Sequence, residues 1–263
     1  MRKNISAILL LACVFSSTQA LGTTPDTTSA TSSLSNISFL VVPYKPMMHL
    51  SDADYDLAKY SDMNPQQVRE QLRLGLLKNL NTKLQIEYDA KIPGQDFVQD
   101  DQRDLDMIYS SLVFEQDTVF PLKANAKKDS LQWKKKVFTS KENTVKSLDK
   151  TYINVGFYDQ LLLPDLSRKY ETDYFIFLNE LDIKTNFEDC LDLALKIYQR
   201  ELKVHYSIFD RSGKQVYGDV AVIKFPSNSN DVDVIIASNF PLLSDQILAT
   251  AKKSVLANQT VIQ

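Results

Sequence analysis

The sequence predicts an α/β domain, of the α+β kind, with a single mixed sheet and helices packed on it. Three observations lead to this fold. Short β-rich apolar runs alternate with amphipathic helical patterns, a C-terminal antiparallel hairpin carries a glycine in its turn, and an amphipathic helix follows that hairpin. Because each of these elements has one apolar face to bury, helices layered on one sheet are the simplest arrangement.

The first 20 residues have the three parts of a secretory signal peptide. Residues 1–4 are basic, residues 5–15 form an apolar run, and residues 16–20 supply small side chains before a cut after Ala20. The apolar run is too short to cross a bilayer as a stable helix, which takes about 20 residues. We therefore expect residues 1–20 to be removed when the protein is exported.

Cys13 gives this leader a second interpretation. It closes the sequence Leu-Leu-Ala-Cys, which resembles the lipobox of bacterial lipoproteins, whose cysteine is lipidated and becomes the mature N-terminus. In the other interpretation Cys13 is one more apolar residue of the signal, because Val14 and Phe15 continue the apolar run. Both stay open, and a lipid is the only membrane attachment that we expect. Cys190 is the only other cysteine, so no internal disulfide is expected in the mature chain.

Residues 21–36 are dominated by serine and threonine and have no apolar period. Such a stretch buries too little surface to offset its ordering entropy, so we expect a flexible tether. Order is expected to begin at Ile37. We predict one α/β domain over residues 37–258, with a lysine-rich excursion at 123–150.

The first elements of the domain have distinct local signals. Residues 37–43 read ISFLVVP, a β-prone run closed by proline, and predict a buried strand. Asn64 and Pro65 begin a helix, with Gln67 placed to complete a capping box. One apolar stripe, expected to pack in the core, runs along this helix: Val68, Leu72, Leu76, Leu77, Leu80 and Leu84.

The middle of the chain predicts two further helices and two strands. A helix is expected from Asp101 to about Gln116, followed after the lysine-rich excursion by a strand at 151–157. Residues 158–170 predict a helix that Pro164 interrupts. Residues 173–183 contain five consecutive apolar or aromatic side chains and predict a second buried strand.

The C-terminal part predicts the hairpin and the last helix. Residues 201–209 and 214–225 are its two strands, joined by the short turn Asp-Arg-Ser-Gly at 210–213. The helix that follows has an apolar face made by Leu243, Ile247, Leu248, Ala251 and Val255.

Several of these segments together resemble one family of envelope α/β domains. A strand ending in VVPY, the strand TDYFIFLNELDI with acidic residues at 180–182, and a hairpin with the turn D-x-S-G-K-x-V at 210–216 carry the resemblance, which covers about residues 37–257. The family includes the N-terminal domain of the translocation protein TolB, the curli secretion lipoproteins and the outer-membrane lipoprotein activators of penicillin-binding proteins. The resemblance implies a non-enzymatic protein that binds partner proteins or assembles into a secretion pore. Residues 123–150 have no counterpart in it.

The motifs that usually carry metal or catalytic chemistry are missing from the sequence. His49 and His205 have no second ligand at short spacing, so we expect no metal site, and His205 is expected at the surface. Asp52, Asp54 and Asp56 mimic the start of a calcium loop but lack its glycine and glutamate, which indicates a solvated acidic turn. No G-x-S-x-G nucleophile motif occurs. We assign no catalytic or cofactor-binding residue and expect no cofactor.

Charge is distributed unevenly along the chain. The formal net charge of −3 gives no general basis for nucleic-acid binding, and we expect none. Residues 85–120 carry nine acidic and two basic side chains, whereas residues 123–150 carry nine lysines and three acidic side chains. The lysine-rich segment is either a docking surface for an acidic polymer, an anionic lipid surface or a partner, or a solvated excursion that the acidic stretch attracts. The candidate partner-binding residues are Trp133, Lys134, Lys135 and Lys136.

These observations favour an exported protein of the periplasm or the outer membrane. The function we expect is a non-enzymatic adaptor, or an assembly or regulatory factor, whose partner is another envelope protein. One alternative is a periplasmic hydrolase of a polysaccharide or cell-wall polymer, using a carboxylate pair such as Asp100/Asp101 or Glu188/Asp189. The other is a subunit of a secretion pore, which needs long amphipathic strands that residues 123–150 do not provide.

Overall fold

The computed structural model describes residues 37–91, 99–119 and 151–262 of the 263-residue chain. The expected signal peptide at 1–20, the expected tether at 21–36 and the lysine-rich excursion at 123–150 lie outside these ranges.

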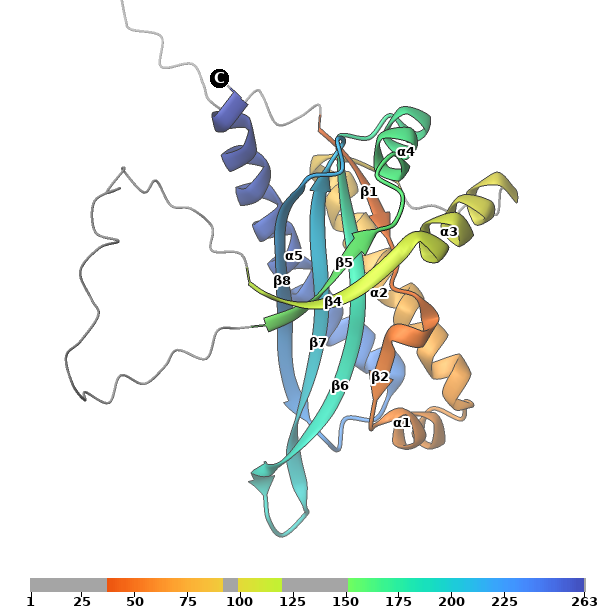
Figure 1. Cartoon of the computed structure of the whole chain (residues 1–263). Coiled ribbons are helices and arrows are strands. Elements are labelled where there is room, and N and C mark those ends of the chain that lie inside the picture. The colour runs from red at the N-terminus through yellow and green to blue at the C-terminus, as the bar shows by residue number, and fades with distance from the viewer. Residues whose placement is uncertain (1–36, 92–98, 120–150, 263) are drawn as a thin grey trace, which may run out of the picture. The chain divides into compact units, whose positions relative to one another are not determined.

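The centre of the domain is a six-stranded mixed sheet, as the sequence predicts (Figure 1). The strand order is β3-β1-β6-β7-β8, and the short β2 pairs with β6. Strand β1 is parallel to β3 and β6, whereas β6, β7 and β8 form an antiparallel series. The strands are β1 (Ser38–Val42), β2 (His49–Ser51), β3 (Asp89–Lys91), β6 (Tyr174–Asp192), β7 (Ile197–Asp210) and β8 (Gln215–Pro226).

One face of this sheet carries helices α1 (Asp54–Tyr60), α2 (Pro65–Glu87) and α5 (Val232–Ile262), with a 3-10 turn at Pro46–Met48 beside β2. The predicted capping box is confirmed, because Asn64 accepts the Gln67 N–H and Gln67 accepts the Asn64 N–H, each at 2.9 Å. The whole predicted stripe of α2 is buried against the sheet and α5. The main core therefore lies between these helices and the sheet.

Helix α5 is longer than the sequence predicted. It begins at Val232, eleven residues before Leu243, the first residue of the predicted apolar face. Its segment Val232–Ala257 is long and apolar enough to cross a membrane by length and composition alone. The apolar face of this segment is buried in the main core beside α2 and β8. This packing is that of a core helix, and the predicted burial of Leu243, Ile247 and Val255 is confirmed.

The opposite face carries helices α3 (Gln99–Ser111) and α4 (Leu162–Tyr170), and a two-stranded ribbon of β4 (Leu112–Thr118) and β5 (Thr151–Phe157). A second apolar cluster forms here around Phe175, Phe177 and Phe209. Because both faces are covered over this stretch, residues 174–183 of β6 are all buried. This accounts for the continuous apolar run in the sequence.

Two sequence predictions in this region need correction. The helix expected from Asp101 to Gln116 ends at Ser111, because Leu112–Thr118 pairs antiparallel with Thr151–Phe157 as a strand. The β-prone side chains of this stretch pack in the second cluster, so tertiary contact outweighs the continuing helical period. The helix expected at 158–170 begins only at Leu162, which puts Pro164 in its first turn, where no helical hydrogen bond is lost.

The predicted hairpin of β7 and β8 is confirmed, and Gly213 in its turn has a φ of +86°, in the left-handed region that favours glycine. The sequence did not predict the second hairpin, formed by β6 and β7. Strand β6 continues nine residues past the predicted end at Ile183, to Asp192. The extra residues mix charged, polar and apolar side chains without a regular pattern, and register shifts follow Asn186, so no period of two marks them as strand.

Candidate partner-binding surfaces

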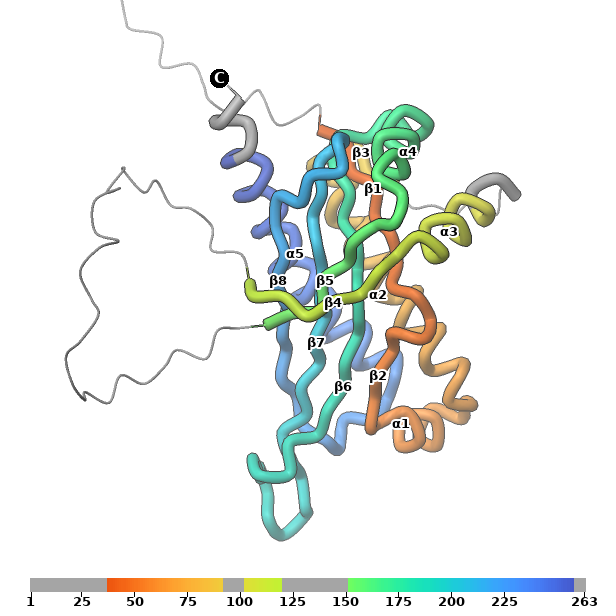
Figure 2. Tube along the Cα trace, viewed as in Figure 1, coloured from red at the N-terminus to blue at the C-terminus, as the bar shows by residue number. Residues whose placement is uncertain are grey.

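The β4–β5 ribbon lies across the sheet face that α2 and α5 leave open (Figures 1 and 2). Near α4 an aromatic cluster holds it. The Phe157 ring meets the rings of Phe177 and Phe209 edge-on, with centroid distances of 5.2 and 5.1 Å. Such aromatic pairs add about 0.5–1.5 kcal/mol each to the burial of their surface. This end of the ribbon is therefore fixed by apolar packing.

Further along, a polar seam holds the ribbon. Asn179 of β6 donates to Ile153 O at 2.7 Å and to Ser207 Oγ at 2.8 Å, and Ser207 donates to Asn154 Oδ1 at 2.6 Å. Asn154 Nδ2 in turn donates to Gln215 Oε1 at 3.0 Å, and Gln215 Nε2 donates to the Tyr152 hydroxyl at 2.7 Å. We call these residues the polar seam: Tyr152, Asn154, Asn179, Ser207 and Gln215.

The polar seam determines where the ribbon can sit. Four of its side chains, all but Gln215, are buried, so each lost hydrogen bond would leave a polar group without water. Asn179 Oδ1 already has no partner within the described ranges. Burial raises the pKa of Tyr152 to about 12, so its hydroxyl stays protonated at neutral pH. A shifted ribbon would break several of these bonds together, which favours a single position.

Tyr152 also needs the glycine opposite it on β8. A Cβ atom added at Gly218 would lie 2.0 Å from the Tyr152 hydroxyl and 2.2 Å from its Cζ. The ring therefore fills the space that any other residue at 218 would occupy. No motif or period in the sequence predicted the polar seam. The polar Asn179 and Ser207 within otherwise apolar strand runs are the only signal of it.

His205 is not the surface residue that the sequence indicated. Its Nδ1 accepts the Ile153 N–H at 2.9 Å, and its Nε2 lies 3.7 Å from Glu180 Oε1. Strand β5 covers the ring, whose side chain is 12% exposed. Burial is the main cause that raises the pKa of Glu180, and the nearby Asp182 carboxylate raises it further. The bond between Ile153 and His205 adds to the contacts between the ribbon and the sheet, whereas the pair of His205 and Glu180 lies within the sheet.

The lysine-rich segment is inserted between the two strands of the ribbon. Thr118 and Thr151 are register partners, so the described chain leaves and re-enters at points about 5 Å apart. Gln116 Nε2 donates to Thr151 Oγ1 at 3.0 Å and closes this end of the ribbon. The predicted partner-binding residues all lie outside the described residues, as does Cys13: Trp133, Lys134, Lys135 and Lys136.

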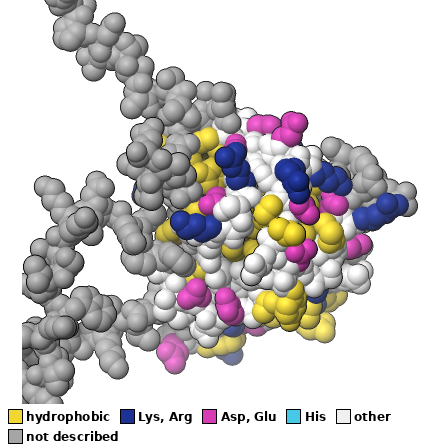
Figure 3. All heavy atoms as spheres, turned by 45° about the horizontal axis from the view of Figure 1, so that its top comes forward, with side chains coloured by type: hydrophobic (Ala, Val, Ile, Leu, Met, Phe, Trp, Pro, Cys, Tyr) yellow, Lys and Arg dark blue, Asp and Glu magenta, His cyan; other side chains and the backbone are white. Residues whose placement is uncertain are grey.

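The acidic stretch at 85–120 is not one surface. Glu87, at the end of α2, pairs with Lys252 of α5. Asp104 of α3 accepts hydrogen bonds from Lys169 at 2.5 Å and Tyr170 at 2.6 Å, both on α4. In Figure 3, basic, acidic and apolar side chains are interspersed over the coloured part of the face shown. Three acidic residues of this stretch, Glu87, Asp89 and Asp104, therefore already have basic partners in the folded body.

His49 and Asp54 belong to a buried polar network that resembles a catalytic pair. Asp54 accepts hydrogen bonds from His49 Nε2 at 3.1 Å and from Arg69 Nε at 2.6 Å, and His49 Nδ1 faces the Tyr44 hydroxyl at 3.3 Å. Burial raises the pKa of Asp54, but the hydrogen bonds from His49 and Arg69 outweigh it, so the pKa lies below its usual value. With both ring nitrogens engaged and His49 buried, the network ties β2, α1 and α2 together.

The same network corrects the expectation of a solvated acidic turn. Asp54 has a side-chain exposure of only 2% and is the first residue of α1. Asp52 accepts the Thr185 N–H at 2.8 Å and fastens this loop to β6. Asp52 and Asp56 are both exposed, as expected, and Asp56 lies 3.9 Å from Arg200. No group of three or more His, Cys, Asp or Glu side chains within 37–91, 99–119 and 151–262 could hold a metal ion.

The two carboxylate pairs considered for a hydrolase have different places. Nothing is described of the Asp100 and Asp101 side chains, although both residues belong to α3. Glu188 and Asp189 are exposed on the extension of β6, away from both surface hollows described below.

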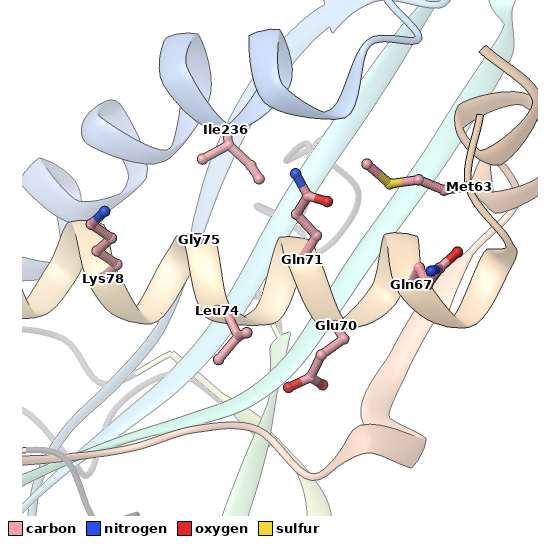
Figure 4. Close-up of a pocket in the computed structure, with 8 residues that line it drawn as sticks. All are labelled: Met63, Gln67, Glu70, Gln71, Leu74, Gly75, Lys78 and Ile236. Atoms are coloured by element: carbon pink, nitrogen blue, oxygen red, sulfur yellow. The ribbon is translucent and has the colours of Figure 1, made fainter. Parts of the chain in front are cut away.

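Among the surface hollows on the described part of the chain, two are considered for ligand binding. One, of about 490 Å³, lies between β5, the start of α4 and the β7–β8 turn. The other, of about 580 Å³, lies along α2 beside Ile236 of α5 (Figure 4). In the close-up, Gln71 lies on the α5 side of α2 whereas Glu70 and Leu74 point to the opposite side. The polar groups of this hollow do not converge on one point, as they would around a small ligand.

The outer edge of the sheet is partly blocked. On the edge strand β8, Gln246 of α5 accepts the Val222 N–H and donates to the Val222 carbonyl, both at 3.1 Å. The Val220 N–H is bound by the Asp219 carboxylate at 2.7 Å. Side chains thus occupy backbone groups that an added strand would need, which disfavours partner binding by strand addition here.

Comparisons with known proteins give no relative for this chain: no family model, no curated protein and no solved structure matches it.

Proposed function

We propose that the chain is a non-enzymatic, partner-binding protein of the bacterial cell envelope, acting as an adaptor or as an assembly or regulatory factor. The observation that carries the proposal is the placement of the lysine-rich segment. Thr118, five residues before the segment, and Thr151, directly after it, are paired at the end of a ribbon that is fixed to the sheet. The segment is thus inserted at one place on a packed body.

The firmness of this attachment supports the proposal. The aromatic cluster fixes the ribbon near α4, and the polar seam and His205 fix it further along. A docking segment that starts from a fixed base loses less freedom when its partner binds than one that hangs from a loose loop. Burying the polar side chains of the seam costs desolvation energy. The proposal gives these side chains a role, because their hydrogen bonds hold the base of the docking segment in place.

The charge of the segment indicates the chemistry of the partner. Nine lysines and three acidic residues at 123–150 give a formal charge of +6, in a chain whose net charge is −3. Such a local concentration steers acidic partners and sets the rate of association. We propose that the partner is another envelope protein with an acidic surface, contacted by Trp133, Lys134, Lys135 and Lys136.

The envelope address rests on the leader at 1–20 and on Cys13. We expect mass spectrometry of the native protein to find either a start at Leu21 or a lipidated Cys13. Changing Cys13→Ser should release the protein from membranes if Cys13 carries a lipid, and should change nothing if the cut follows Ala20. An intact Met1 in the native protein would refute the address.

The docking proposal is tested by removing charge. Changing Lys134, Lys135 and Lys136 to glutamine should weaken co-purification of the partner from the native envelope, and should flatten its dependence on salt. Thermal stability should stay nearly unchanged, because exposed charges contribute little to folding.

A matched control loses the same charge elsewhere on the described surface, at Lys59, Lys214 and Lys253, which are all exposed. This control should keep both binding and stability. If the two triple variants bind equally well, or if the test variant loses stability together with binding, the lysine-rich segment is not the docking element.

A further inference from the structure

We propose that the end of the β6–β7 hairpin, residues 186–197, is a second docking element, which inserts into an apolar groove of a partner protein that is edged by basic side chains. We call this segment the distal hairpin. It is separate from the lysine-rich segment, and its test does not depend on that segment.

The distal hairpin projects beyond the rest of the sheet. Pairing of β2 with β6 ends at Ile183, and pairing of β8 with β7 ends at Gln199. Past these points β6 and β7 pair only with each other, down to Asp192 and Ile197. Figures 1 and 2 show this hairpin extending past α1 and the lower ends of the other strands.

Large apolar side chains are exposed along this projection. Phe187, Leu191, Leu193 and Leu195 are between 48% and 82% exposed. The ring of Phe187 has only an edge-on contact, with Tyr198 at 5.2 Å between centroids. A two-stranded hairpin gains little stability by itself, and apolar side chains gathered on such a projection are typical of an interaction surface.

The charges around these side chains favour a partner of one kind. Residues 186–197 contain three acidic side chains, Glu188, Asp189 and Asp192, and one basic side chain, Lys196. The formal charge of this segment is therefore −2. An anionic bilayer would repel it, and so would a second copy packed hairpin to hairpin. A groove with an apolar floor and basic side chains at its edges would match both the apolar and the acidic residues.

The exposed apolar side chains are not confined to the end of the hairpin, which favours a groove over a flat bilayer. Phe187 and Leu191 lie on β6, whereas Leu193 and Leu195 lie in the turn at 193–196. A bilayer surface would contact mainly the turn, but a groove can enclose both pairs. The hairpin also lies far from the N-terminal entry of the chain. Strand β6 begins beside Phe39 of β1, and the strand β7 that pairs with it is 14 residues long, about 45 Å, up to the turn after Asp192. Any N-terminal anchor therefore joins the domain at the opposite end.

The experiment uses Cys190, which is exposed on the distal hairpin and is the only cysteine besides Cys13. An environment-sensitive dye on Cys190 of the mature protein reports whether the hairpin becomes buried. A photo-crosslinking residue at Leu193, compared with one at the exposed Tyr158, identifies the protein that the hairpin contacts in the native envelope. That protein is then purified and titrated against the dye-labelled chain.

We expect a discrete cross-linked protein from position 193 and none of the same size from position 158. The purified partner should shift the dye emission to shorter wavelength. The double variant Leu193→Asp with Leu195→Asp should bind at least about 30-fold more weakly, because two buried leucines would be lost from the centre of the contact. The control Tyr158→Asp should bind normally, and the melting temperature of both variants should match that of the unmodified chain.

Several outcomes would overturn the proposal. A dye shift with phosphatidylethanolamine and phosphatidylglycerol vesicles that the leucine variant abolishes would make the hairpin a membrane-binding element. Concentration-dependent association of the purified chain that the same variant abolishes would make the occupant a second copy. The hairpin would not have the proposed role if no cross-link were specific to position 193. The same conclusion would follow if the leucine variant and the unmodified chain bound the cross-linked protein equally well.

Discussion

Gly218→Ala should loosen the base of the β4–β5 ribbon. The added methyl group would lie 2.0 Å from the Tyr152 hydroxyl and 2.5 Å from its Cε2, far inside van der Waals contact. Tyr152 is buried and belongs to the polar seam, so its ring cannot move without breaking its bond to Gln215. Overpacking costs about 1–3 kcal/mol, and a lost hydrogen bond costs about 1 kcal/mol. Replacing a glycine returns about 0.4–1 kcal/mol through the unfolded state. We therefore expect a net loss of about 2 kcal/mol.

The assay is urea unfolding monitored by circular dichroism, together with hydrogen exchange of the Ile153 amide. This amide donates a hydrogen bond to His205 Nδ1. The matched control is Gly156→Ala in the same ribbon, because a Cβ atom there meets nothing within 4 Å. Its effect should stay within about 0.5 kcal/mol. In a Tyr152→Ala background the cost of Gly218→Ala should largely vanish, since the clash is gone. Equal stability of the Gly218 and Gly156 variants, or the same Gly218 cost in both backgrounds, would refute the reasoning.

Two further changes test the main core and its buried network. Leu76→Ala should destabilise the domain by about 2–5 kcal/mol because it opens a cavity under α2; Leu74→Ala, at a position 53% exposed, should cost well under 1 kcal/mol. A similar cost at both positions in urea unfolding would contradict the assigned face of α2. Asp54→Asn should cost about 2 kcal/mol at neutral pH, because His49 and Arg69 lose a charged partner. The folded-state pKa of Asp54 is lowered, so its stabilising effect is present above the unfolded pKa, about 3.9, and is lost as pH falls through the folded value. The stability difference between variant and unmodified chain should therefore shrink below about pH 4, and a constant difference down to pH 2 would show that ionisation of Asp54 does not matter.

The two docking proposals concern different parts of the molecule. The lysine-rich segment is attached at Thr118 and Thr151 on the ribbon, and the distal hairpin is the far end of β6 and β7. The first is basic and the second is apolar and acidic, so they suit different partner surfaces. If both proposals hold, the chain would bind two partners at once, as an adaptor does.

Local signals in the sequence determined the elements that carry their own pattern. Asn64, Pro65 and Gln67 predicted the start of α2, and Gly213 predicted the tight turn of the β7–β8 hairpin. The mixed sheet, the core faces of α2 and α5 and the order of the longer elements followed from periodicity, whereas β2, α1, β3 and β4 were not predicted. These predictions succeed because hydrogen-bond caps, turn geometry and amphipathic period depend on neighbours only a few residues away.

Only the tertiary structure decided the features that depend on residues distant in the sequence. Leu112–Thr118 is a strand because Thr151–Phe157 lies beside it, although its own pattern continues a helix. His205 is covered because β5 crosses β7, and Asp54 is buried because Arg69 and His49 meet it from two other elements. Gly218 is required because Tyr152 fills its space. In each case the decisive energy comes from packing or from a hydrogen bond between separate elements, which the pattern within any one element does not reveal.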